Sequence, residues 1–143
     1  MAPGSFAGIP RPFCLLDAVL FWDRDRLWAE RRFEGAPVWQ AAEAAAQACA
    51  LHQRVLSDFG RHAFLLSVQR FPLKPDRLEG LFAIHAKVLG QSGMSASYGV
   101  RLACGPAVLE GRLAIGLAPY GERFQETRLV PHFKERWQCL SKK

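Results

Sequence analysis

Glu43 is the first residue to consider for chemistry, because it is the single carboxylate in an alanine-rich run within the stretch from Gly35 to Gly60. The stretch contains the longest uninterrupted run of good helix formers in the chain, so it predicts a long helix. Pro37 is a residue type favoured in a first helical turn, and Gly60 suits a helix end. A lone acid on a buried helix is either held by structural hydrogen bonds or chemically active.

Alanines cover most of the circumference of this predicted helix, so no broad polar face is left. They make a thin rod that other backbone segments can approach closely, and we expect the rest of the fold to be organised around it. Gln47 follows Glu43 by one helical turn, a spacing at which it can orient the carboxylate. The alanines are Ala41, Ala42, Ala44, Ala45, Ala46, Ala48 and Ala50.

Length and composition limit the class of protein. The 143 residues, half of them hydrophobic, predict one domain with its own core. No apolar run reaches the roughly 20 residues of a membrane span, and no secretory signal is evident. The four cysteines are widely spaced without a Cys-x-x-Cys pair, which is typical of reduced thiols in a cytoplasmic protein rather than of a metal site. The net charge of +6 favours an anionic partner, such as nucleic acid, a phosphorylated cofactor or an acidic protein.

Apolar runs typical of strands flank the helix on both sides. Two precede it at residues 18–22 and 27–33, and four follow it at residues 63–71, 78–89, 94–104 and 108–117. Residues 1–11 are rich in Gly and Pro and predict an irregular lead-in, while residues 119–143 form a basic, aromatic tail without a strand pattern. This order predicts an α+β domain over residues 1–143, with one helix against an antiparallel sheet.

Three motifs resemble those of the 3-hydroxyacyl-acyl-carrier-protein dehydratases, a hot-dog-fold family in which a curved sheet wraps a central helix. Residues 12–17 (Pro-Phe-Cys-Leu-Leu-Asp) resemble the family motif at the start of the first strand. Residues 43–48 (Glu-Ala-Ala-Ala-Gln-Ala) resemble the helix signature whose acid is catalytic. Residues 71–76 (Phe-Pro-Leu-Lys-Pro-Asp) resemble the region after the third strand. The likeness covers about residues 10–118.

The resemblance implies an assignment for each candidate residue. Glu43 corresponds to the catalytic acid, and Gly35, Pro37, Trp39 and Gln47 are expected to bind an acyl thioester carried by acyl carrier protein. Trp39 is alternatively a core aromatic residue at the helix start. Hot-dog sites usually lie between two protomers, so we expect a homodimer or a heterodimer with a similar subunit. We expect no metal, no cofactor and no nucleic acid, because no RNA-binding motif accompanies the basic tail.

One departure from the family pattern concerns the second catalytic residue. In the family this residue is a histidine in a Gly/Pro-containing loop before the helix, but here the loop is shortened to residues 34–37 and no histidine precedes His52. The pattern Gly35-x-Pro37-x-Trp39 followed by Glu43 is similar to that of a divergent subgroup of predicted dehydratases, some of which occur with aryl-polyene lipid biosynthesis. Dehydration needs both a base and an acid, so the base is unassigned. Glu43 alone, or a histidine from a partner subunit, would have to provide it.

Three functions therefore remain open. The first is a dehydratase of fatty-acid or polyene-type lipid synthesis, and the second is a non-catalytic hot-dog subunit that binds acyl chains or completes a partner's site. The third is an acyl thioesterase, because hot-dog thioesterases also use a helix carboxylate. We expect His52 at the surface near the helix end, His62 in a loop near the site and His85 on a strand, and Cys49 in the core.

Overall fold

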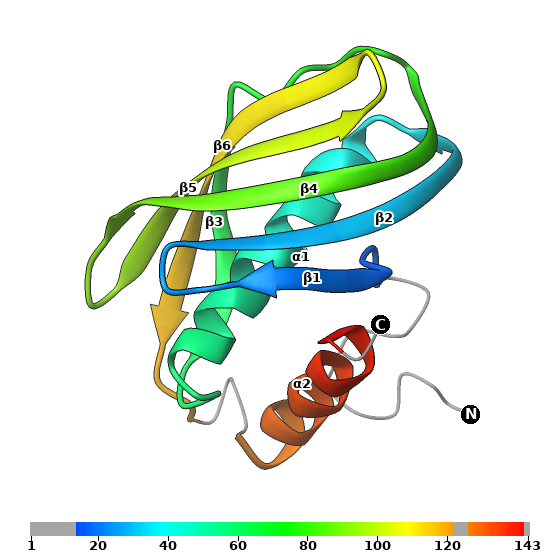
Figure 1. Ribbon diagram of the computed structural model, residues 1–143. Coiled ribbons are helices and arrows are strands. Elements are labelled where there is room, and N and C mark those ends of the chain that lie inside the picture. Colours follow the sequence, from blue (N-terminus) through cyan, green and yellow to red (C-terminus); the bar gives the residue numbers. More distant parts are fainter. Residues whose placement is uncertain (1–13, 122–125, 142–143) are drawn as a thin grey trace.

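The computed structural model describes residues 14–121 and 126–141. The predicted lead-in at residues 1–11 lies outside them. Within the described residues the chain forms six strands and two helices (Figure 1). In chain order they are β1 (Ala18–Trp22), β2 (Arg26–Pro37), α1 (Trp39–Leu56), β3 (His62–Gln69), β4 (Arg77–Gln91), β5 (Ser95–Cys104), β6 (Ala107–Ala118) and α2 (Glu126–Ser141).

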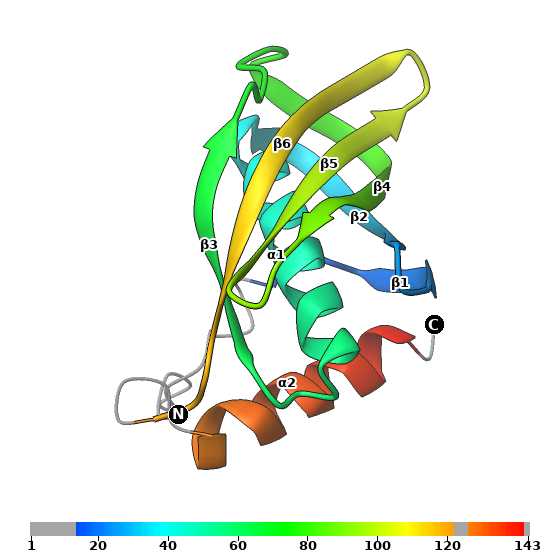
Figure 2. The same ribbon diagram turned by 90° about the vertical axis from the view of Figure 1, so that its left-hand side faces the viewer.

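The six strands form one antiparallel sheet in the order β1-β2-β4-β5-β6-β3, which curves around α1 (Figures 1 and 2). Side-chain alternation determines which face meets the helix. Ile84 of β4 pairs with Ala29 of β2 on one side and with Leu102 of β5 on the other, and all three side chains are fully buried. The fold class is therefore α+β with a curved sheet around a central helix, as predicted.

The alanines of α1 explain how the sheet can close around it. Ala41, Ala44, Ala45 and Ala48 have no exposed surface, and neither does Cys49. Because these side chains are short, the strands approach the helix backbone from several sides. The prediction of a thin rod is confirmed, and so is the core position of Cys49, where burial raises the pKa of the thiol well above its usual value.

The ends of α1 differ from the sequence-based expectation. Pro37 is the last residue of β2 and pairs with Arg77 of β4, so its interpretation as a first-turn helical residue is wrong. At the other end the helix stops at Leu56, and the left-handed turn after it is made by Asp58 and Phe59, with φ of 51° and 60°. Strand pairing thus overrides the local preference of proline for a helix start.

The second helix was not predicted from the sequence. Part of the segment expected to lack a regular pattern forms α2, which crosses near the C-terminal end of α1 and contacts β1 (Figure 2). Its buried residues Leu129 and Phe133 pack with Phe59 from the turn after α1. In residues 14–121 and 126–141, neither helix combines the length and the apolar character needed to cross a bilayer.

Candidate functional site

A cavity of about 340 Å³ runs along one side of α1, and we call it the α1 groove. Residues of α1 form one wall, the first residues of β3 form another, and Leu129 and Phe133 of α2 also line it. Most of the lining is apolar, with charged side chains contributed by Glu43, Arg54 and Arg136. The groove is thus bounded by the central helix, an edge strand of the sheet and the C-terminal helix.

The spacing of the α1 residues explains the shape of the groove. Glu43, Gln47, Ala50 and Arg54 follow each other at intervals of four, three and four residues, so they share one face of the helix. Arg54 lies eleven positions after Glu43, which corresponds to about three turns and roughly 16 Å between the two backbone positions along the axis. A carboxylate and a guanidinium therefore stand at opposite ends of a mainly apolar surface.

Gln47 orients Glu43 at the first end. The Gln47 side chain donates from Nε2 to Glu43 Oε1 at 3.4 Å, and its Oε1 accepts from the backbone N–H of Leu15 at 2.8 Å. Because that N–H occupies the amide oxygen, the amide NH₂ faces the carboxylate. The segment before β1, which carries the first motif, thus helps to position the helix acid.

Glu43 itself is solvent-exposed in the single chain, although the helix that carries it is buried. Burial of the helix therefore does not bury its acid in the isolated chain. The alanines that contact the sheet occupy other positions around the helix, whereas Glu43 lies on the face that borders the groove.

Arg54 lies at the other end of the groove and is only 6% exposed. Its guanidinium donates to the carbonyl oxygen of Ala63 at 2.5 Å and lies 3.6 Å from the centre of the Phe133 ring. Burial, with a further contribution from Arg136, lowers the pKa of Arg54 to about 10. Among the described residues no carboxylate forms an ion pair with Arg54.

His62 lines the same groove but lies at the Arg54 end. It is the first residue of β3, and the bond from Arg54 to the adjacent Ala63 places this part of β3 beside the last turn of α1. Burial and the neighbouring Arg54 lower the pKa of His62 to about 4, so the ring is neutral at pH 7. His62 is therefore remote from Glu43 within one chain.

His52 has a structural role. It is fully buried, with Nδ1 2.6 Å from the hydroxyl of Tyr98 and Nε2 2.7 Å from the backbone oxygen of Asp23. His52 lies nine positions, about two and a half turns, after Glu43, so it is on the opposite side of α1. The expectation of a surface histidine is wrong, because distant segments enclose it.

The two remaining histidines are also remote from Glu43. His85 alternates along β4 with the buried Ile84 and Ala86 and stacks on Trp28, so it lies on the sheet face that points away from α1. His132 lies on α2, where its charged neighbours include Arg54 and Arg136. Within the described part of the chain, no histidine is placed beside Glu43.

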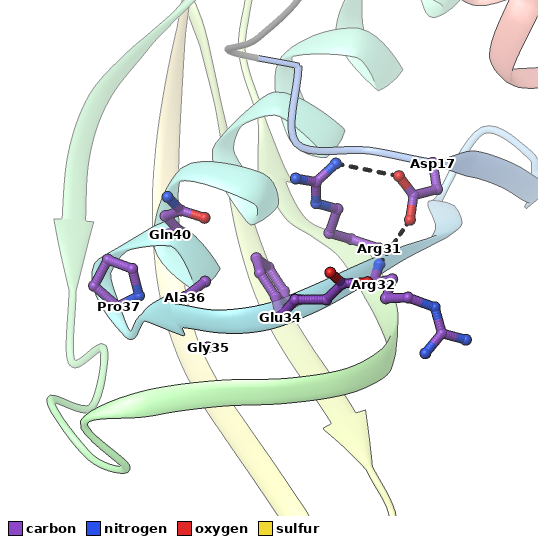
Figure 3. A pocket seen from close by; sticks show the side chains of 9 residues that line it. Asp17, Arg31, Arg32, Glu34, Gly35, Ala36, Pro37 and Gln40 are labelled. Carbon is purple, nitrogen blue, oxygen red and sulfur yellow. Dashed lines mark hydrogen bonds and ion pairs between the residues drawn. The ribbon is translucent and has the colours of Figure 1, made fainter.

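Gly35 and Pro37 line a separate, more open hollow of about 640 Å³ beside the end of β2 (Figure 3). Its other side is formed by Asp17, which accepts from the Arg31 guanidinium at 3.2 Å and from the backbone N–H of Arg32 at 2.7 Å. Gly35 has a φ of 65° at a bulge in the pairing of β2 with β4, a conformation that favours glycine. These two residues are therefore not grouped with Glu43.

Trp39 contributes to neither cavity. Its side chain is 62% exposed, so the alternative interpretation as a core aromatic residue is wrong for the single chain. Of the five predicted site residues, the structure brings together Glu43 and Gln47. Arg54 and the α2 residues of the groove were not predicted as site residues. The four-, three- and four-residue spacing from Glu43 to Arg54 was the available signal for Arg54.

No set of three or more His, Cys, Asp or Glu side chains is arranged to hold a metal ion within residues 14–121 and 126–141.

The chain matches no protein-family model, and no curated protein matches its sequence.

Several solved structures have a similar fold. One is the dehydratase heterocomplex ApeI:P from Xenorhabdus doucetiae, with 18% identity, a TM-score of 0.66, and coverage of 85% of this chain and 90% of that chain. A mutant thioesterase from Pseudomonas aeruginosa has 14% identity and a TM-score of 0.60, and the match covers 71% of this chain and 80% of that chain. A thioesterase from Haemophilus influenzae has 12% identity and a TM-score of 0.59, and the match covers 71% of this chain and 77% of that chain. At these identities the likeness establishes the fold, and this chain has the hot-dog fold.

Proposed function

We propose that this protein binds acyl thioesters and acts as a 3-hydroxyacyl-acyl-carrier-protein dehydratase-like subunit in fatty-acid or polyene-type lipid synthesis. The observation that carries the proposal is the Glu43–Gln47 pair at one end of a mainly apolar groove along the central helix. Apolar walls suit an acyl chain, and an oriented carboxylate suits proton transfer at its reactive end.

The chemistry requires two proton transfers. A base removes a proton from the carbon next to the thioester carbonyl, and an acid protonates the departing 3-hydroxyl, which leaves as water and yields the enoyl thioester. We assign the acid to Glu43. The Gln47 amide donates to the carboxylate and limits its orientation.

A partner subunit is proposed to supply the base, because no histidine in the described part of this chain lies beside Glu43. A surface suited to pairing is present at β3, which forms one edge of the sheet. Leu65, Leu66 and Val68 of this strand are 41%, 55% and 40% exposed, and an open apolar strand edge is a site for pairing with another chain. The similarity to a dehydratase heterocomplex supports a heterodimer with a second hot-dog subunit, and a homodimer is the alternative.

The carrier protein, the extent of the domain and its compartment are also part of the proposal. The net charge of +6 is suited to an acidic acyl carrier protein as the donor of the thioester. We propose that the hot-dog domain spans residues 1–143 and works in the cytoplasm without a cofactor. Binding of the carrier protein should weaken as salt is added, because salt screens exposed charges.

A thioesterase is the second candidate, and the exposure of Glu43 favours it. Solvent-accessible carboxylate oxygens can activate a water molecule, which would attack the thioester carbonyl and release the acid and a free thiol.

One assay separates these functions. The protein is mixed with 3-hydroxyacyl and enoyl thioesters, alone and together with a hot-dog protein encoded by a neighbouring gene, and both hydration–dehydration and thiol release are followed. We expect dehydration when both proteins are present and none when either protein is absent. Thiol release by the protein alone would replace the dehydratase proposal with the thioesterase. Binding without turnover under either condition would leave a non-catalytic subunit.

A further inference from the structure

Arg54 is a buried cation that has no carboxylate partner within residues 14–121 and 126–141. The side chain is 6% exposed. Its Nε is buried without a hydrogen-bond partner there. Burying an unpaired charge is costly, so such a group in a cavity marks a candidate site for a ligand of opposite charge.

We propose that the Arg54 end of the α1 groove binds a carboxylate at the far end of the acyl chain, which makes acyl thioesters with a terminal carboxylate the preferred ligands. This inference rests on the proposed function, because it assumes that the thioester end of the ligand lies at Glu43.

Arg54 lines the groove, and its contacts leave part of its hydrogen-bonding capacity unused in the described structure. The Phe133 ring centre lies 3.6 Å from the guanidinium carbon, so the ring occupies a face of the planar group. A carboxylate approaches a guanidinium in its plane, where the N–H donors point. One donor is used by the Ala63 carbonyl oxygen, while Nε is unused in the described structure. Stacking on Phe133 thus fixes the plane of the group and uses none of its N–H donors.

The other charges at this end also favour an anion. Arg136 of α2 lines the groove, and its charge acts against that of Arg54. His62 lines the same end but is neutral at pH 7, because burial and Arg54 depress its pKa. A bound carboxylate would therefore face two cations and no competing acid, since Glu43 is the one acidic residue that lines the groove among the described residues.

The distance between the two ends sets the length of the ligand. Along α1 the groove is lined by Ala46, Ala50 and Leu51 between the two charged ends, so the middle suits methylene groups. The separation of roughly 16 Å along the helix axis corresponds to an extended acyl chain of medium length.

The test compares two non-hydrolysable acyl-pantetheine analogues of equal length, one ending in a carboxylate and one ending in a methyl group. Calorimetric titration of the wild-type protein, with its partner subunit where one is found, measures both affinities over a series of chain lengths. We expect the carboxylate analogue to bind about 10- to 100-fold more tightly at the matching length, the range expected for a charge-assisted hydrogen bond. Equal or tighter binding of the methyl analogue would overturn the inference and leave the proposed function intact. Failure of both analogues to bind would overturn the proposed function.

Two variants test whether Arg54 is the source of this preference. Arg54→Met keeps an unbranched aliphatic side chain and removes the guanidinium and its charge, so the two analogues should bind about equally, whereas Arg54→Lys should retain part of the preference. Arg101→Met, which removes an exposed cation from β5, is the matched control and should retain all of it. Circular dichroism checks that α2 stays folded. If the Met variant is unfolded, the wild-type comparison alone decides.

Discussion

The two sides of α1 carry polar clusters of opposite character. On the side of His52, the hydroxyl of Tyr98 lies 2.6 Å from the imidazole and accepts from the Gln53 amide at 2.8 Å. Gln53 and Gln91 exchange a further pair of hydrogen bonds at 2.9 and 3.1 Å. Buried polar groups that satisfy one another in this way stabilise a fold and offer nothing to a ligand.

On the groove side, the two charged groups Glu43 and Arg54 have no ion-pair partner among the described residues. Glu43 is exposed and accepts one long bond of 3.4 Å, and Arg54 is buried. The same helix therefore carries a closed polar network on one side and uncompensated charges on the other. Whether a polar side chain is paired within the fold, rather than its burial or residue type, therefore distinguishes a structural polar group from a candidate functional one.

The largest expected effect is on catalysis by Glu43→Gln. The change keeps size and hydrogen-bonding reach but removes the ionisable proton, so dehydration should fall on the order of 100-fold or more. The melting temperature should stay close to the wild-type value, because Glu43 is exposed and makes one long bond. Steady-state rates with the partner subunit and a thermal melt measure the two effects. Equal activity of the two proteins would remove Glu43 from the mechanism.

On the His52 side of α1, Tyr98→Phe should lower the stability of the protein and not its catalytic rate. The change removes the hydroxyl that His52 and Gln53 share, which leaves two buried polar groups short of a partner. We expect a loss of about 1–3 kcal/mol in the free energy of unfolding, with little change in the turnover of the folded protein. Urea denaturation and the dehydration assay measure these quantities. A large loss of turnover without a stability change would reverse the comparison.

Gln47→Ala should have an intermediate effect on catalysis. It removes the amide that orients Glu43 and the acceptor of the Leu15 N–H. Because the bond to Glu43 is long, we expect a decrease in turnover of roughly 3- to 10-fold. Gln40→Ala, another glutamine of α1, is the control and should leave the rate unchanged. A loss as large as that of Glu43→Gln would mean that Gln47 takes part in the reaction itself.

The smallest effect concerns the pH dependence of stability. The folded pKa of His62 is about 4, below the ordinary value of 6.5, so the unfolded chain binds its proton first as the pH falls. The stability associated with this residue is present above about pH 6.5 and is lost as the pH falls toward 4. His62→Asn should therefore flatten the decline of stability over this window, as measured by thermal melts from pH 7 to pH 4. An unchanged slope would show that His62 is already solvated in the folded protein.

The sequence was sufficient to predict the sheet, the central helix and the Glu43–Gln47 pair, because these depend on local pattern. Helix propensity and alanine content specify α1, and a spacing of four residues specifies that Gln47 adjoins Glu43. The Pro37 interpretation failed because pairing of β2 with β4 is a long-range effect.

Other parts of the site depend on segments far apart in the chain. The role of His52 depends on Tyr98 and Asp23, which lie 46 and 29 residues away. Arg54 would ordinarily be interpreted as a basic residue that complements the helix dipole in a last turn. It is buried because α2 packs over it, and α2 itself was missed because Pro131 lies within the helix and argues against one. The apolar stripe of α2 was present at Leu129, Phe133 and Leu140.

The most direct test of the central claim is the crystal structure of the protein, with its partner subunit where one is found, bound to a non-hydrolysable 3-hydroxyacyl-pantetheine. We predict that the acyl chain lies along α1 between Glu43 and Arg54. Its 3-hydroxyl should lie within hydrogen-bonding distance of the Glu43 carboxylate, and a histidine of the partner should lie near the carbon next to the carbonyl. An acyl chain in the hollow beside Asp17 and Arg31, with Glu43 in contact with solvent alone, would contradict it.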